Sequence, residues 1–134
     1  SASLDLPWDS PVFSESTHKP LVVTSVEAAP ERLVLAHEWC DVVRLEGAAL
    51  NPLQIIAAIA YRGLRRIVCE GGPHLLSQLS EARLIDEADI TVAPTLASGG
   101  QIPTGRAAPD PPRMQLASII EQDSWLFTRY VRSG

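Results

Sequence analysis

Runs of β-branched and apolar residues alternate with stretches of helical spacing along the first two thirds of the chain. The runs predict strands at 20–25, 40–47, 65–70 and 85–96. The stretches between them predict helices at 28–39, 51–62 and 73–84. Strands that alternate with helices in this way favour a parallel sheet with helices on its faces.

The segment that follows Asn51 has the clearest helical pattern. Asn51 is a favourable N-cap residue, and Pro52 suits the first helical position. Apolar residues recur at spacings of three and four, which makes one apolar stripe: Ile55, Ile56, Ile59 and Ala60. Gly63 fits the left-handed position that follows the last turn of a helix.

Both ends of the chain differ from this alternation. The first twenty residues are rich in proline and serine, which indicates turns. After a Gly/Pro loop at 98–112, the segments 114–122 and 124–132 both have a strand pattern, with a tight turn predicted at Gln122-Asp123. We therefore expect an α/β fold with a mostly parallel central sheet and a C-terminal antiparallel hairpin.

Composition and charge narrow the class of protein. The 134 residues suggest a single domain, 1–134, and the 46% hydrophobic share is that of a globular chain. A net charge of −5 argues against partners such as nucleic acid or an anionic membrane. No apolar run is long enough for a membrane span. The first residues have neither a basic nor an apolar region, so we expect no signal peptide.

The two cysteines, Cys40 and Cys69, lie far apart in apolar surroundings and have no CxxC spacing. We predict no metal site from them. Both are expected to be small core residues in a reducing, cytoplasmic setting.

The short stretch Glu70-Gly71-Gly72-Pro73 holds the main candidate for a binding site. It follows the strand predicted at 65–70 and opens the next helix, at the edge where open α/β sheets bind ligands. The start of a helix has free N–H groups, and glycines have no Cβ to keep a phosphate oxygen away. We therefore predict a phosphate or pyrophosphate here, with Glu70 facing ribose hydroxyls or a base.

A purely structural interpretation of the same stretch stays open. A glycine pair also suits a tight strand-to-helix turn, and the stretch is not the GxGxxG fingerprint of dinucleotide-binding folds. From these residues alone the two interpretations have similar weight.

A longer pattern around the glycines resembles a known family. Residues 67–100, IVCEGGPHLLSQLSEARLIDEADITVAPTLASGG, resemble the reductase domain of riboflavin biosynthesis, which has the dihydrofolate reductase-like fold. The matching positions are Glu70 to Pro73, Leu75, Leu76, Leu79, Leu84 to Glu87, Ala93, Pro94, Gly99 and Gly100. The segments SLDLP at 3–7 and WLFTRYVR at 125–132 also resemble parts of that family. The resemblance implies a three-layer sandwich.

The resemblance also implies an activity and a set of binding residues. The family reduces 5-amino-6-(5-phosphoribosylamino)uracil with NADPH, by hydride transfer to C1′ of the ribose. The residues that would bind the cofactor are Gly71, Gly72, Pro73, His74 and Leu75 along the diphosphate, and Ser1 and Ser3 near the adenosine ribose. Glu70 would face the substrate or the nicotinamide end.

The chain departs from the family in its first part. The family's Ser-Leu-Asp-Gly motif is absent, because Ser3-Leu4-Asp5 is followed by Leu-Pro and fits a later segment. We therefore expect an N-terminally incomplete reductase domain, and we predict no catalytic acid. Asp86-Glu87 favours a structural role over proton transfer.

Two alternatives stay open at this point. One is a different reductase of the same fold that acts on a pterin or a related heterocycle. The other is a non-catalytic nucleotide-binding or dimerisation module. A homodimer is expected from the resemblance and from the apolar C-terminal hairpin, whose edge would be protected by pairing.

Overall fold

The strand–helix–strand pattern of the first half forms as predicted. In the computed structural model, which describes residues 1–96 and 111–133, β1 (Leu21–Ser25) leads through α2 (Pro30–Trp39) to β2 (Asp41–Leu45). The two strands are parallel, from the pair Leu21 and Asp41 to the pair Ser25 and Leu45. A parallel pair has its carboxyl ends at one edge, so the turn after β1 and the loop after β2 lie next to each other.

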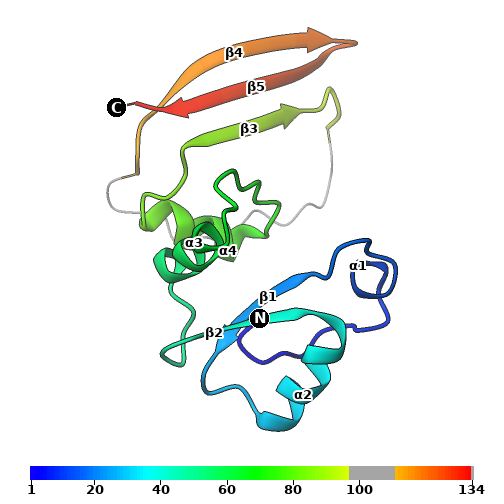
Figure 1. The fold of residues 1–134 in the computed structure, drawn as a ribbon. Helices are drawn as coiled ribbons and strands as arrows, with labels where there is room; N and C mark the ends of the chain where they lie inside the picture. Colours follow the sequence, from blue (N-terminus) through cyan, green and yellow to red (C-terminus); the bar gives the residue numbers. More distant parts are fainter. Residues whose placement is uncertain (97–110, 134) are drawn as a thin grey trace. The chain divides into compact units, whose positions relative to one another are not determined.

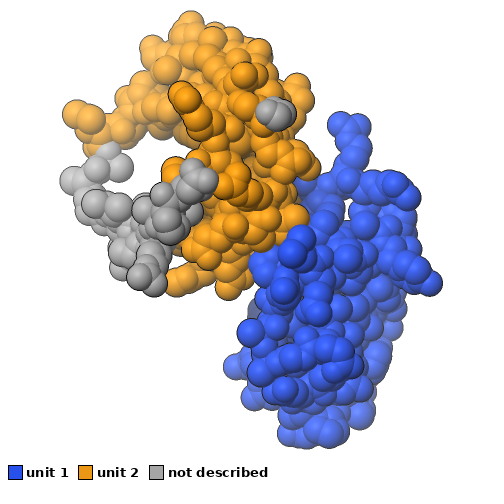
Figure 2. All heavy atoms as spheres, turned by 90° about the vertical axis from the view of Figure 1, so that its left-hand side faces the viewer, with its two compact units in different colours: residues 1–67 blue, residues 68–134 orange. Residues whose placement is uncertain are grey.

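The described residues fall into two compact units, residues 1–67 and residues 68–134 (Figure 2). The core of the first unit consists of five buried residues: Leu4, Val22, Ala28, Ala36 and Cys40. Trp8 and Phe13 pack against it, with their ring centroids 4.9 Å apart. Phe13 belongs to α1 (Pro11–Ser14), a single turn within the stretch predicted to consist of turns.

The helix predicted after Asn51 is α3 (Pro52–Tyr61). The Asn51 side chain accepts a hydrogen bond of 2.9 Å from the backbone N–H of Leu53, as an N-cap does. Beyond the last turn, Gly63 has a φ of +83°, the left-handed conformation that its position predicted.

The second unit contains α4 (Pro73–Glu81) and a three-stranded antiparallel sheet. The strands are β3 (Glu87–Val92), β4 (Met114–Gln122) and β5 (Trp125–Arg132), and Figure 1 shows β5 between the other two. The predicted C-terminal hairpin is confirmed as β4 and β5. A register shift between Leu116 and Ser118 marks a bulge in β4.

The hairpin turn lies one residue later than predicted. Gln122 pairs with Trp125, so Asp123 and Ser124 form the two-residue loop in place of Gln122 and Asp123. Their φ angles are +53° and +66°, as expected for the turn type that suits the twist of a hairpin. The Glu121 carboxylate accepts a 2.7 Å hydrogen bond from the Ser124 N–H, which helps to hold this conformation.

The prediction of a strand at 65–70 is wrong. The structure has no strand between α3 and α4, and residues 61–70 are all exposed. Isoleucine and valine there favour extended backbone, but a strand also needs a neighbour for its hydrogen bonds, and no described strand pairs with this segment. We expected one mostly parallel sheet. The described residues instead form a parallel pair of strands and a separate antiparallel sheet.

The α/β class is confirmed by this mixture of helices with parallel and antiparallel strands. Most of the predicted Gly/Pro loop, with Gly99 and Gly100, lies outside the described residues. None of the described helices has the length and apolar character that crossing a membrane requires.

Candidate functional site

The glycine stretch lies at the start of α4, as the sequence predicted. Gly72 is the N-cap, Pro73 is the first helical residue, and no side chain caps the helix. The first backbone bond into the helix runs 3.1 Å from the Leu76 N–H to the Gly72 carbonyl. The N–H groups of His74 and Leu75 precede this bond and have no partner in the described part of the chain, so they are free to donate to an anion.

The two glycines have different surroundings. A Cβ on Gly71 would lie 2.7 Å from Cδ2 of Leu75 and 3.4 Å from Sγ of Cys69, so this glycine lets the turn pack closely on its own helix. A Cβ on Gly72 would meet no heavy atom of the described residues within 4 Å. The φ of −69° and ψ of 177° at Gly72 suit any residue. Neither the backbone conformation nor packing against the described residues requires glycine at position 72.

Glu70 and His74, on either side of the glycines, are both exposed. Among the described residues, neither side chain has a hydrogen-bond or ion-pair partner. The strand that would have placed Glu70 at a sheet edge is absent, so its place beside a substrate stays a prediction.

Ser1 and Ser3 lie in the first unit, in the segment that runs beside β1. The Ser1 nitrogen donates to the Val23 carbonyl at 3.0 Å. The hydroxyl oxygens accept bonds from nearby backbone, Ser1 from the Leu4 N–H at 3.1 Å and Ser3 from the Asp5 N–H at 3.3 Å. Both hydroxyls have a local structural role, and their place near an adenosine stays a prediction.

One feature at the carboxyl edge of β1 and β2 could not be predicted from the sequence. The Arg44 guanidinium donates a 2.6 Å hydrogen bond to the Val26 carbonyl, just beyond the end of β1. Beside it, the buried Ser25 hydroxyl donates to the Gly47 carbonyl at 2.6 Å and accepts from the Glu27 N–H at 3.0 Å. From the sequence alone, an arginine within a strand pattern is expected to be solvated. The contact of Arg44 with Val26 depends on the pairing of β1 with β2.

Asp86 and Glu87 have the structural role that we favoured. Glu87 forms an ion pair with Arg129, and Asp86 pairs with Arg132 at 2.8 Å. The hydrogen bond with Glu87, together with the charge of that carboxylate, raises the pKa of Arg129. These carboxylates connect the start of β3 to β5.

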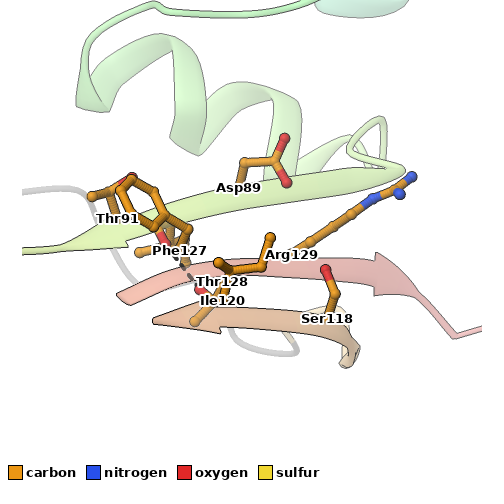
Figure 3. A pocket seen from close by; sticks show the side chains of 8 residues that line it. Asp89, Thr91, Ser118, Ile120, Phe127, Thr128 and Arg129 are labelled. Carbon is orange, nitrogen blue, oxygen red and sulfur yellow. Dashed lines mark hydrogen bonds between the residues drawn. The ribbon is translucent and has the colours of Figure 1, made fainter. Parts of the chain in front are cut away.

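The antiparallel sheet has an open hollow of about 250 Å³, shown in Figure 3. Its lining combines the apolar side chains of Ile120 and Phe127 with the polar ones of Asp89, Ser118 and Thr128. The Arg129 guanidinium at its rim is already paired with Glu87. The hollow therefore offers an anion no unpaired charge from Arg129, and the glycine stretch is the better candidate for a phosphate.

The two cysteines lie in different environments. Cys40 is buried, as expected, and burial raises the pKa of its thiol, while the charge of Lys19 opposes that shift. Cys69 is exposed, so the expectation that it belongs to the core is wrong. Over residues 1–96 and 111–133 we find no group of three or more His, Cys, Asp or Glu side chains that could hold a metal ion.

Comparisons with known proteins place the chain in a family. The model of the RibD C-terminal domain matches residues 1–125. The chain belongs to the RibD C-terminal domain family. A search among curated proteins found no match.

Solved structures agree with this family. A pyrimidine reductase-like protein from Corynebacterium diphtheriae is 26% identical, with a TM-score of 0.79 over 100% of this chain. Two forms of Acinetobacter baumannii RibD are each 17% identical, with TM-scores of 0.68 over 97% and 0.66 over 96% of the chain. The chain spans 59% of the Corynebacterium protein and 35% of each RibD chain. The two RibD structures support the fold alone.

Proposed function

We propose that this domain is an NADPH-dependent reductase of a phosphoribosylamino-pyrimidine, of the 5-amino-6-(5-phosphoribosylamino)uracil type. Membership of the RibD C-terminal domain family supports a pyrimidine reductase-like role. The observation that carries the proposal is the open backbone at Gly72, beside the free amides of the first turn of α4. The backbone conformation and the described residues would both allow a side chain at position 72. Glycine instead leaves this space open, where a diphosphate would approach.

The free amides at the start of α4 suit the diphosphate of a nicotinamide dinucleotide. The amides of His74 and Leu75 would donate to the diphosphate oxygens, and the positive end of the helix would favour their charge. When bound, the nicotinamide would supply a hydride for C1′ of the substrate ribose. The exposed Glu70 carboxylate would accept hydrogen bonds from ribose hydroxyls, which would orient the sugar. The proposal includes a cytoplasmic location for the reaction.

Calorimetry with NADPH tests the proposal, with the unchanged chain beside Gly72→Asp. The new carboxylate would occupy the open space and repel a diphosphate, so we expect micromolar binding to be lost. Asn51→Asp is the matched control, because it adds the same charge at the start of α3, and it should bind as the unchanged chain does. Equal binding by all three proteins would show that the cofactor does not lie at the glycine stretch. No binding by the unchanged chain would contradict the proposal for this chain.

The proposal includes a homodimer. β4 is at one edge of the antiparallel sheet, and Leu116, Ile119 and Ile120 on it are each more than half exposed. A long, apolar edge strand invites pairing with another strand, and a second copy would cover it. Light scattering should give twice the mass of one chain, and a monomer at working concentration would refute this part.

A further inference from the structure

α4 ends at a residue with a strained backbone conformation. The Arg83 N–H donates to the Ser80 carbonyl at 3.0 Å, and the Leu84 N–H donates to the Leu79 carbonyl at 2.9 Å. These two bonds form the Schellman motif, in which the residue after the helix is left-handed and is usually glycine. Here that residue is Arg83, with a φ of +55°, and its Cβ makes this conformation costly. Contacts from outside the helix are therefore needed to offset the strain.

Arg132, the last residue of β5, supplies three contacts to the connection after α4. Its guanidinium donates a 2.8 Å hydrogen bond to the Arg83 carbonyl and forms a 2.8 Å ion pair with the Asp86 carboxylate. Its backbone N–H donates to the Asp86 carbonyl, also at 2.8 Å. The partial negative charge of the last helical carbonyls favours a cation at this place. Arg132 therefore holds the left-handed turn and ties it to the sheet.

The remainder of α4 has little packing to keep it in place. The helix has nine residues, a length at which helices in water are marginal without tertiary contacts. Leu79 is buried, whereas Leu75 and Leu76 are 37% and 54% exposed. Because helix formation is cooperative, fraying at the C-terminal end of so short a helix also disturbs its first turn.

We propose that Arg132 is a positioning residue for the diphosphate site at the start of α4. By fixing the C-terminal end of the helix, it keeps the first-turn amides of His74 and Leu75 in place for the cofactor. The inference rests on the proposed function, since it concerns the same amides. A helix of this length spans about 13 Å, so Arg132 acts through α4 and not by touching the ligand. α4, β3 and β5 all belong to the second unit.

Hydrogen exchange on Arg132→Met and Arg129→Met tests the effect on the helix. Arg129 is the matched control, because it also lies on β5 and pairs with a carboxylate, that of Glu87, but has no bond to the end of α4 among the described residues. Arg132→Met should speed exchange at the amides of residues 76–82 about fivefold, with exchange in β4 unchanged. Arg129→Met should leave α4 unchanged. Faster exchange throughout the second unit, or equal effects of both variants, would overturn the inference, because either indicates a general loss of stability.

Calorimetry connects the helix end to the cofactor. NADPH affinity should fall about threefold or more for Arg132→Met and stay unchanged for Arg129→Met. Arg132→Lys keeps a cation and a donor at the helix end, so it should recover part of the affinity and part of the protection from exchange. Faster exchange in α4 with unchanged NADPH affinity would overturn the inference, because Arg132 would then hold the helix without positioning the site.

Inorganic pyrophosphate separates this inference from the proposed function. It presents a diphosphate without nucleosides, so it tests the amides whichever cofactor the domain uses. Titration of the unchanged chain should shift the amide resonances of His74 and Leu75, and Arg132→Met should bind more weakly. If pyrophosphate behaves in this way but NADPH does not bind, the proposed function fails and the inference stands. The absence of these shifts in the unchanged chain, or equal binding by both proteins, would overturn the inference.

Discussion

The starts of α3 and α4 have similar sequence signals, but only one of them is capped by a side chain. Each has proline at its first helical position, after an extended N-cap residue. Asn51 closes the start of α3 with its own side chain, whereas Gly72 leaves the start of α4 open. Glycine at an N-cap costs only a few tenths of a kcal/mol relative to asparagine. The comparison shows that an open helix start can be kept for a ligand at little cost in stability.

The largest expected effect comes from making the start of α4 like that of α3. Gly72→Asn would place an amide in the open space and let it accept from the first-turn N–H groups. We expect NADPH affinity to fall about tenfold or more, which is about 1.4 kcal/mol, while the free energy of unfolding rises by a few tenths of a kcal/mol. Calorimetry and urea unfolding measure the two. Unchanged affinity with increased stability would mean that the start of α4 is only a turn.

The reverse change at α3 should affect stability alone. Asn51→Ala removes the acceptor of the Leu53 N–H and should lower the free energy of unfolding by about 1 kcal/mol. NADPH affinity should stay the same, because this helix start is closed by its own side chain. Asn51→Ser, which keeps an acceptor, should recover most of the loss. An effect of Asn51→Ala on NADPH affinity would contradict the prediction that only the start of α4 binds the cofactor.

The smallest effect should separate the two glycines. Gly71→Ala forces Leu75 away from its present position and should lower the free energy of unfolding by about 0.5–1 kcal/mol. Gly72→Ala meets no neighbour among the described residues and should lack this steric penalty. Repeating Gly71→Ala in a Leu75→Ala background removes the shortest contact, with Cδ2, so most of the penalty should be absent there. If it persisted in thermal unfolding, the role of Gly71 would not be close packing on Leu75.

Most of the elements could be predicted because their signals are local. The cap at Asn51, the glycine after α3, the β-branched run of β1 and the apolar alternation of the hairpin all act within a few residues. The segment at 65–70 shows the limit. Its residues favour extended backbone, but a strand exists only where another strand pairs with it, and that partner lies far away in sequence.

The location of the candidate site could be predicted from the sequence, but the contacts of its residues could not. The motif Gly-Gly-Pro located the start of α4. It could not distinguish the glycine that packs on Leu75 from the glycine that faces open space. That distinction depends on where Leu75 and Cys69 lie, and not on the glycines themselves. Arg44 was missed for a related reason, because its reach to Val26 depends on the pairing of β1 with β2.

The two-residue turn at Asp123 and Ser124 has a consequence for the order of folding. It brings β4 and β5 together by closing a very short loop, and hairpins of this kind form in about 1–10 μs. β3 can join only after a much longer segment is closed, because Val92 pairs with Leu126 across the whole connection to β4. Within this sheet we therefore expect β4 and β5 to pair first, and β3 to add afterwards to the edge of β5.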